Sequence, residues 1–276
     1  MKTKSRTKKS IVNARMNLIC YFLTLVVAFF TRKTLLDYLG TEFLGLTGTL
    51  GSLLSFLNLA ELGIGSAIAY VLYKPLFECD ESKINEIISV LGYLYRKIGS
   101  FILLAGLLLS AFLPWIFSNT EIPLSVIYTG FYCYLVSSMF GYFISYKITI
   151  LSADQRNYIV TGFFQLITTI KVILQMTLAY YTRNFYLYFA VELISGLLLS
   201  LLLNHKVYRC YPWLQTDVRT GRELYKEYPE IGKYIKQLFF HKIGGFVQGQ
   251  VLPILIYAFV SLPMVALYTN YTLITQ

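Results

Sequence analysis

The sequence predicts an all-α, multi-pass membrane protein, and three observations support this fold class. Of the 276 residues, 56% are hydrophobic and only 14% are charged, which is more apolar surface than a soluble core can bury. Apolar runs of about 20 residues recur along the chain, the length that an α-helix needs to cross roughly 30 Å of hydrocarbon. The runs are continuous instead of short and alternating, which argues against a membrane β-barrel.

About seven or eight transmembrane helices are expected. Clusters of charged and turn-forming residues, such as "CDESK" and "SADQRN", separate the apolar runs. The first run follows a basic tail but is too long for a signal peptide and lacks a small-residue cleavage pattern, so it is predicted to be an uncleaved helix. The expected spans are residues 11–31, 44–72, 99–118, 124–146, 159–181, 185–204 and 238–260, followed by an eighth that begins near Pro263 and is cut off at Gln276.

The basic residues predict a cytoplasmic N-terminus. Of the 24 Lys and Arg residues, only Arg32, Lys33 and Arg183 fall in loops on the opposite side, and Lys171 falls within a span. Basic loops are retained in the cytoplasm, so the charged side of this arrangement is the inner one. This topology, together with anionic lipid, accounts for the net charge of +10 without any nucleic-acid partner.

Two segments outside the expected spans have helical or turn character. Residues 80–98 carry an apolar stripe at helical spacing, which predicts an amphipathic helix along the cytoplasmic surface, capped by Asp80 or Ser82. A connector role is favoured for this helix over a regulatory or partner-binding one. Residues 209–236 are expected to form a cytoplasmic tether in which Pro212 and Pro229 interrupt the helices.

The second expected span carries polar residues on one face. At 100° per residue, Glu61 and Gly65 lie within about 80° of Asn58, and either Gly63 or Gly65 would permit a bend. An ionised carboxylate at membrane depth costs about 3 kcal/mol or more, so it faces a partner or a water-filled cavity. Glu61 is therefore expected either to lock helices together in a buried network or to line a hydrated transport path.

The fifth expected span carries a basic residue at similar depth. Lys171 shares a helix face with Thr168 and Gln175, too far from the cytoplasmic end to reach the interface easily. Its ammonium therefore needs an anion nearby. Two sources stay open: a protein carboxylate, Glu61 or Glu192 of the sixth span, or an anionic substrate group such as a phosphate.

The sequence contains no recognisable machinery for covalent chemistry. It has no phosphate-binding GxxxxGK[ST] loop, no HExxH metal motif, no Ser/His/Asp set and no acidic glycosyltransferase-like cluster. Its four cysteines are widely spaced, so neither a metal site nor a disulfide is expected. A carrier without catalytic residues, metal or cofactor fits the sequence better than an enzyme does.

Two segments, Arg32 to Leu76 and Lys236 to Phe246, resemble bacterial oligosaccharide flippases, the Wzx-like branch of the multidrug/oligosaccharidyl-lipid/polysaccharide superfamily. The resemblance extends over the whole chain, with "LDYLG", "LAELGIGSAI" and "YKPL" as its most specific parts. It implies two helical lobes around a central cavity that alternates between inward-facing and outward-facing states. It also implies a substrate, an undecaprenyl-diphosphate-linked oligosaccharide used for capsule, exopolysaccharide or O-antigen assembly in the bacterial inner membrane.

The resemblance also implies a division of the chain. Residues 1–208 correspond to a first lobe of six membrane helices, residues 209–236 to the cytoplasmic inter-lobe loop, and residues 237–276 to the incomplete start of a second lobe. The sequence is therefore interpreted as a fragment of a longer carrier. Implied partners are the lipid-linked oligosaccharide, membrane lipids, and a polysaccharide polymerase with glycosyltransferases.

The residues and the resemblance together assign candidate roles. The expected substrate-binding residues are Lys171, Gln175, Thr168 and Asn58. Glu61 and Glu192 are expected to couple an ion or to form a buried charge pair. Two alternatives stay open: a cation-coupled multidrug exporter of the same superfamily, which would use Glu61 to bind protons or Na⁺, and a non-transporting membrane scaffold of a glycan-assembly complex.

Overall fold

The computed structural model describes residues 6–61 and 63–275, leaving out the side chains of residues 6–8, 60, 248–250 and 273–275. Lys2 and Lys4 of the predicted cytoplasmic tail therefore lie outside the described residues. The described part is helical nearly throughout and contains no strand. In chain order its elements are α1 (Arg6–Leu57), the 3₁₀ turn η1 (Asn58–Glu61), α2 (Ile64–Glu78), α3 (Glu81–Ser110), α4 (Leu113–Ile116), α5 (Leu124–Phe143), the 3₁₀ turn η2 (Tyr146–Ile148), α6 (Thr149–Ala153), α7 (Asn157–Thr182), α8 (Phe185–Cys210), α9 (Gly221–Glu227), α10 (Pro229–Phe259) and α11 (Leu262–Thr275).

The all-α membrane class is confirmed at the level of helix length and composition. Within the described residues, six helices are long and apolar enough to cross a membrane: most of α1, then α3, α5, α7, α8 and α10. The first of these contains one non-helical residue, Gly40, at φ 87° and ψ 166°. α1 therefore consists of two helical stretches, and the predicted loop between residues 31 and 44 is helical on both sides of Gly40.

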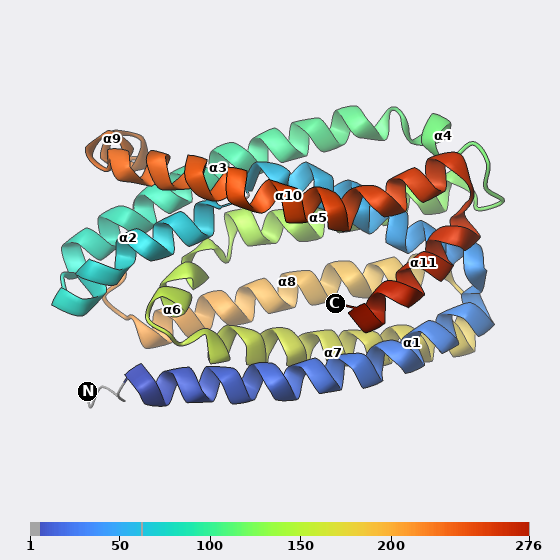
Figure 1. Cartoon of the computed structure of the whole chain (residues 1–276), viewed down its shortest axis with the longest axis horizontal. Helices are drawn as coiled ribbons and strands as arrows, with labels where there is room; N and C mark the ends of the chain where they lie inside the picture. The colour runs from blue at the N-terminus through green and yellow to red at the C-terminus, as the bar shows by residue number, and fades with distance from the viewer. Residues whose placement is uncertain (1–5, 62, 276) are drawn as a thin grey trace.

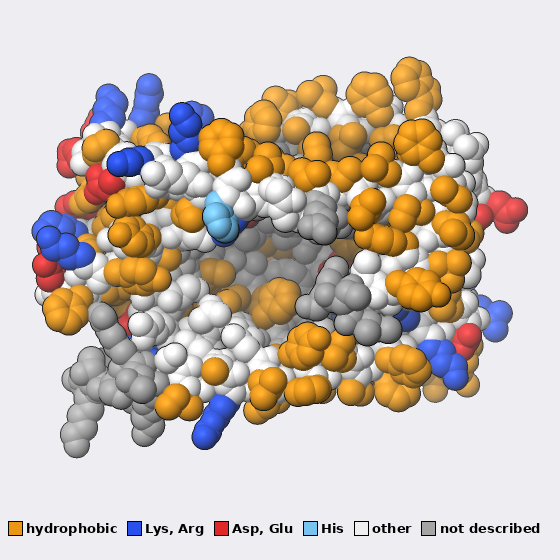
Figure 2. Space-filling model, in the orientation of Figure 1, with side chains coloured by type: hydrophobic (Ala, Val, Ile, Leu, Met, Phe, Trp, Pro, Cys, Tyr) orange, Lys and Arg blue, Asp and Glu red, His pale blue; other side chains and the backbone are white. Residues whose placement is uncertain are grey.

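The outer surface has the character of a lipid-facing surface. Large apolar side chains point outward from the helices, including Phe29, Trp115 and Phe259, which are 67%, 80% and 83% exposed. Figure 2 shows that hydrophobic side chains cover the middle of the visible face, whereas charged ones gather mainly at its two ends. The same face is hollowed near its centre. An apolar middle band between charged ends is what a hydrocarbon layer requires of the protein that crosses it.

The long helices run side by side along the longest axis of the molecule (Figure 1). α7 lies between α1 and α8, α5 contacts both α8 and α3, and α10 and α11 pack on α1. The apolar centre lies where the second stretch of α1 meets α5 and α8: Phe43 stacks on Phe185, and Phe131 and Phe189 are fully buried. Gly130 allows this contact, because a Cβ there would lie 2.5 Å from the Phe189 ring.

The second predicted span, residues 44–72, is not one continuous helix. α1 ends at Leu57, η1 occupies Asn58–Glu61, and α2 begins only at Ile64. The predicted bend is confirmed at Gly63, which adopts the left-handed φ of 94°; a glycine carries no steric penalty there. Gly65 lies inside α2 instead. The break coincides with the polar residues of the span, whose side chains bond across to other helices.

The predicted surface helix over residues 80–98 is also corrected. It forms the first half of α3, which continues without interruption into the third predicted span. Asp80 caps it as expected, since its side chain accepts the backbone N–H of Lys83 at 3.1 Å. This bond, together with the nearby Lys83 ammonium, lowers the pKa of Asp80. The apolar stripe packs inside the protein and not on lipid, because α2, α5 and α9 cover its buried residues Ile84, Ile87, Ile88, Leu91 and Tyr95.

Candidate functional site

Two adjoining cavities lie inside the bundle. The first, of about 350 Å³, is formed by α5, α7 and α8. The second, of about 470 Å³, is formed by η1, α2, α3, the end of α5 and the turns that follow it. Both reach the C-terminal part of α5, and they share the lining residues Ser138, Gly141, Ser145 and Ile148.

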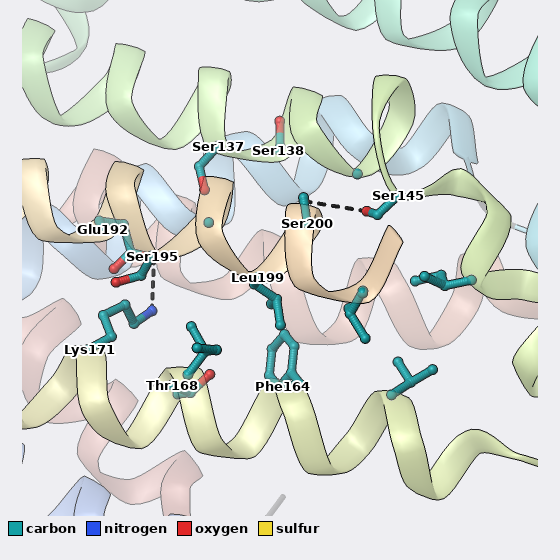
Figure 3. A pocket seen from close by; sticks show the side chains of 16 residues that line it. Ser137, Ser138, Ser145, Phe164, Thr168, Lys171, Glu192, Ser195, Leu199 and Ser200 are labelled. Atoms are coloured by element: carbon teal, nitrogen blue, oxygen red, sulfur yellow. Dashed lines mark hydrogen bonds and ion pairs between the residues drawn. The ribbon is translucent and has the colours of Figure 1, made fainter. Parts of the chain in front are cut away.

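A partly buried ion pair forms the charged end of the first cavity (Figure 3). Lys171 on α7 donates from Nζ to Oε1 of Glu192 on α8 at 2.8 Å. The two side chains are only 21% and 17% exposed. Gln175, one turn after Lys171, donates from Nε2 to Glu192 Oε2 and to the Tyr188 carbonyl oxygen, both at 3.2 Å. The Glu192 carboxylate is thus held by two donors from α7, and the Lys171 ammonium balances its charge.

Hydroxyl-bearing residues line the rest of the first cavity together with apolar ones such as Ile148, Phe164 and Leu199. Side chains from α5 and α8 face those from α7 across it, and Ser145 Oγ donates to Ser200 Oγ at 3.4 Å. α8 approaches α5 closely at Gly196, where a Cβ would contact the Ser137 side chain. The hydroxyl-bearing lining residues are Ser137, Ser138, Ser145, Thr168, Ser195 and Ser200.

A carboxylate without a cationic partner occupies the second cavity. Glu61 Oε1 accepts the Tyr95 hydroxyl at 2.7 Å, and its Oε2 accepts the Tyr142 hydroxyl at 2.9 Å. The Tyr142 oxygen also lies 3.2 Å from Asn58 Oδ1. Among the described residues, no Lys or Arg comes within ion-pair distance of Glu61. In the described part of the chain, the groups that bond this carboxylate are two neutral tyrosine hydroxyls.

The predicted site residues fall into two groups. Lys171, Thr168 and Glu192 line the first cavity, and Asn58 and Glu61 line the second. The final predicted residue, Gln175, is 2% exposed and lines neither cavity, but it orients the Glu192 carboxylate. Of the two carboxylates proposed for Lys171, the partner is Glu192 and not Glu61.

The tyrosines that hold Glu61 are not predicted from the sequence. Tyr95 lies in the predicted surface helix over residues 80–98, and Tyr142 lies near the end of the predicted span 124–146. Their rings meet edge to face, with centroids 5.5 Å apart. One signal was available for Tyr95: it belongs to the same helical stripe as Ile84 and Ile88, so if protein covers that stripe, its hydroxyl needs an acceptor.

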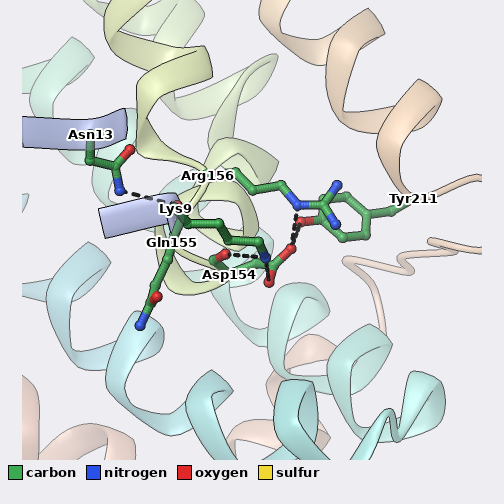
Figure 4. Close-up of polar contacts among 6 residues, drawn as sticks. All are labelled: Lys9, Asn13, Asp154, Gln155, Arg156 and Tyr211. Atoms are coloured by element: carbon green, nitrogen blue, oxygen red, sulfur yellow. Dashed lines mark hydrogen bonds and ion pairs between the residues drawn. The ribbon is translucent and has the colours of Figure 1, made fainter. Parts of the chain in front are cut away.

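A second polar cluster fastens the start of α1 to the end of the bundle (Figure 4). Asp154, just after α6, accepts Lys9 Nζ at 2.7 Å through Oδ1. Its Oδ2 lies 2.6 Å from Arg156 Nε and accepts the Tyr211 hydroxyl at 2.9 Å. Burial and the Asp154 charge raise the pKa of Tyr211 above its usual value, as expected for a phenol that donates to a carboxylate.

Replacing Asp154 by Asn should destabilise the protein by about 2 kcal/mol, because two mostly buried cations lose their shared carboxylate. The expected observation is a lower midpoint of thermal unfolding in detergent, together with faster proteolysis near the start of α1. Glu81→Gln provides the control, since Glu81 is exposed and forms no ion pair within the described residues. Equal unfolding midpoints for Asp154→Asn and the unmodified chain would contradict this prediction.

Comparison of the chain with protein-family models, with curated proteins and with solved structures finds no match.

Proposed function

We propose that this chain is a carrier of lipid-linked oligosaccharides, a flippase that moves undecaprenyl-diphosphate-linked repeat units from the cytoplasmic to the outer leaflet of a bacterial inner membrane. The observation that supports this proposal is the pair of adjoining cavities inside a bundle whose outer surface is apolar, each with charged and hydroxyl-bearing residues among its apolar walls. Charge and hydroxyl groups at such depth are stable when they face water, cargo or each other.

In the proposed mechanism Lys171 binds the diphosphate. In the unloaded carrier the ammonium is held by Glu192 at 2.8 Å, which avoids an unpaired buried charge. An arriving diphosphate offers more negative charge than one carboxylate and competes for the same ammonium. Gln175 keeps Glu192 in place during this exchange, so that the pair can form again after release.

The other walls of the first cavity suit a glycan. Serine and threonine hydroxyls of the first cavity can exchange hydrogen bonds with sugar hydroxyls, while the prenyl tail stays in lipid beside the apolar helices. Lys242 of α10 donates to Ser66 at the edge of the second cavity at 2.8 Å and would attract the anionic head group there. Glycosyltransferases would build the repeat unit before this step, and a polysaccharide polymerase would join the units after it.

The proposal is tested by reconstitution. The purified chain is placed in liposomes that contain a fluorescent undecaprenyl-diphosphate oligosaccharide, and a membrane-impermeant glycosidase reports how much glycan reaches the outside. We expect the chain to accelerate this appearance above that in protein-free liposomes, and unlabelled lipid-linked glycan to compete. If the chain binds the glycolipid but does not accelerate the appearance of glycan outside the liposomes, the scaffold role is favoured instead.

One observation favours the cation-coupled exporter as a second candidate. Glu61 faces a cavity with two tyrosine donors and no cationic partner among the described residues, which is the arrangement expected of a proton or Na⁺ site. The two candidates make opposite demands on Lys171, because a buried ammonium repels a cationic drug and attracts a diphosphate.

Glu61→Gln separates the two candidates. For a flippase, we expect the rate of glycan appearance outside the liposomes to fall about tenfold at most, since one hydrogen-bonded carboxylate is worth about 1.4 kcal/mol here. We also expect no efflux of a cationic dye from cells, whether residue 61 is Glu or Gln. For an exporter, cells that express the chain would expel ethidium, and Glu61→Gln would abolish that efflux while Lys171→Gln left it intact. The second pattern would contradict the proposed flippase.

A further inference from the structure

A third cavity, of about 450 Å³, lies apart from the two central ones and is much more polar. Its walls come from α3, the end of α5, η2, the last turns of α8, and residues 216–219 between α8 and α9. It shares only Tyr146 with the second cavity and no residue with the first. Three cationic side chains line it, Arg96, Lys147 and Arg219, against a single carboxylate, Asp217.

Lys147 is the most unusual of these cations, because it is only 9% exposed. Its Nζ donates to the Tyr208 hydroxyl and lies 4.4 Å from the centre of the Tyr208 ring and 5.5 Å from that of Tyr146. None of the three cations forms an ion pair with a described carboxylate. A buried ammonium normally has an anionic partner, so this cavity has an excess of unmatched positive charge.

Asn204 supplies a further unsatisfied group in the same cavity. Its Oδ1 is buried and has no hydrogen-bond partner among the described atoms. A buried amide oxygen without a donor costs free energy. Rotating the carboxamide by 180° would instead direct its NH₂ group to this position, where it would be a donor to an anion that also contacts the cations.

The cavity is built before any ligand arrives, because the segment that carries Arg219 is fastened to α3 and η2. The Asp217 N–H donates to Ser89 Oγ at 3.0 Å, and the hydroxyls of Tyr146 and Thr216 lie 3.1 Å apart. Gly92 lets this segment approach closely, since a Cβ there would lie 2.8 Å from Val218. The wall is thus held in position by hydrogen bonds that do not use the ammonium or guanidinium groups.

We infer that this cavity binds a phosphate group. Several cations, two of them guanidinium forks that can bond two oxygens at once, together with an amide donor, match the charge and the several acceptor oxygens of a phosphate better than those of a carboxylate. The group can belong to an anionic lipid head group or to a soluble phosphate. Because it shares no charged residue with the central cavities, this site does not depend on the proposed transport function.

Binding to the purified full chain tests the inference. Native mass spectrometry measures association with phosphatidylglycerol, and calorimetry measures association with inorganic phosphate. The Arg96→Gln/Arg219→Gln variant changes only exposed side chains, so it should fold, and we expect its affinity to fall about tenfold or more. The matched control is Lys97→Gln/Arg222→Gln, which removes two exposed charges from α3 and α9 outside the cavity and should change the affinity less than about twofold.

Each outcome decides the inference. Saturable binding of phosphatidylglycerol alone, lost in the cavity variant, assigns the phosphate to a lipid head group. Binding of inorganic phosphate as well, lost in the same variant, assigns it to a soluble ligand. Saturable binding of neither probe, or equal losses in the cavity variant and the matched control, would overturn the inference. Lys147→Met is a second cavity variant with the same expected loss.

Discussion

Lys171→Gln should reduce glycan translocation in liposomes by about a hundredfold, the largest functional effect that we expect. The substitution removes the only cation in the first cavity among its described lining residues, and one charge-assisted contact to a diphosphate is worth about 3 kcal/mol. Lys74→Gln is the matched control, because the Lys74 side chain is 82% exposed and its loss should leave the rate unchanged.

Lys171→Gln also leaves the Glu192 carboxylate without the Lys171 ammonium, so loss of structure has to be separated from loss of substrate binding. Lys171→Gln/Glu192→Gln replaces the ion pair by two amides that can bond each other, and we expect it to unfold close to the temperature of the unmodified chain. We still expect this double variant to translocate poorly, because neither amide attracts a diphosphate as an ammonium does. Translocation at the unmodified rate would show that the pair only ties α7 to α8.

Gly45→Ala should destabilise the bundle by about 3 kcal/mol, the largest structural effect that we expect. A Cβ at Gly45 would lie 2.7 Å from the carbonyl carbon of Leu262 and 2.9 Å from its Cβ. Because these include backbone atoms, the contact cannot be relieved by rotating a side chain. The start of α11 would have to move away from α1, and the thermal unfolding midpoint in detergent should fall by several degrees.

Gly51→Ala is the matched control for this prediction. It lies in the same helical stretch as Gly45, yet nothing approaches within 4 Å of its Cβ position. Alanine is favoured over glycine in a helix by up to about 1 kcal/mol, so this variant should be as stable as the unmodified chain or slightly more so. If Gly45→Ala and Gly51→Ala unfolded at the same temperature, the packing of α11 on α1 would be wrong.

The sequence predicts those helices that are uniformly apolar and have turn residues at both ends. α5, α7 and α8 agree with the predicted spans within a few residues, except that α8 continues to Cys210. It predicts a bend at Gly63 or Gly65 but not that the helix already ends at Leu57, because the residues that flank the break remain apolar. It also identifies the correct face of residues 80–98 but not what covers it, since periodicity cannot distinguish lipid from protein.

The sequence predicts which polar residues of the candidate site lie inside the membrane, but not which of them bond each other. The position of Lys171 and Glu61 along their predicted spans is enough to indicate that each needs a partner. Pairing depends on which helices are neighbours. A usable signal was the short turn at Arg183 and Asn184, which makes α7 and α8 antiparallel neighbours and brings Lys171 and Glu192 to similar depths.

The first cavity, which holds Lys171, should contain water while the protein is in the membrane, because the proposed transport needs a hydrated path. The direct measurement is the reaction of single cysteines with a membrane-impermeant thiol reagent, in a chain whose native Cys20, Cys79, Cys133 and Cys210, all free thiols, are replaced by serine or alanine. We predict that Thr168→Cys, inside the first cavity, reacts readily, whereas Ile173→Cys, 54% exposed on the outer surface of the same helix, does not. Rapid reaction at Ile173 with none at Thr168 would show instead that the first cavity is closed to water and that the carrier proposal is wrong.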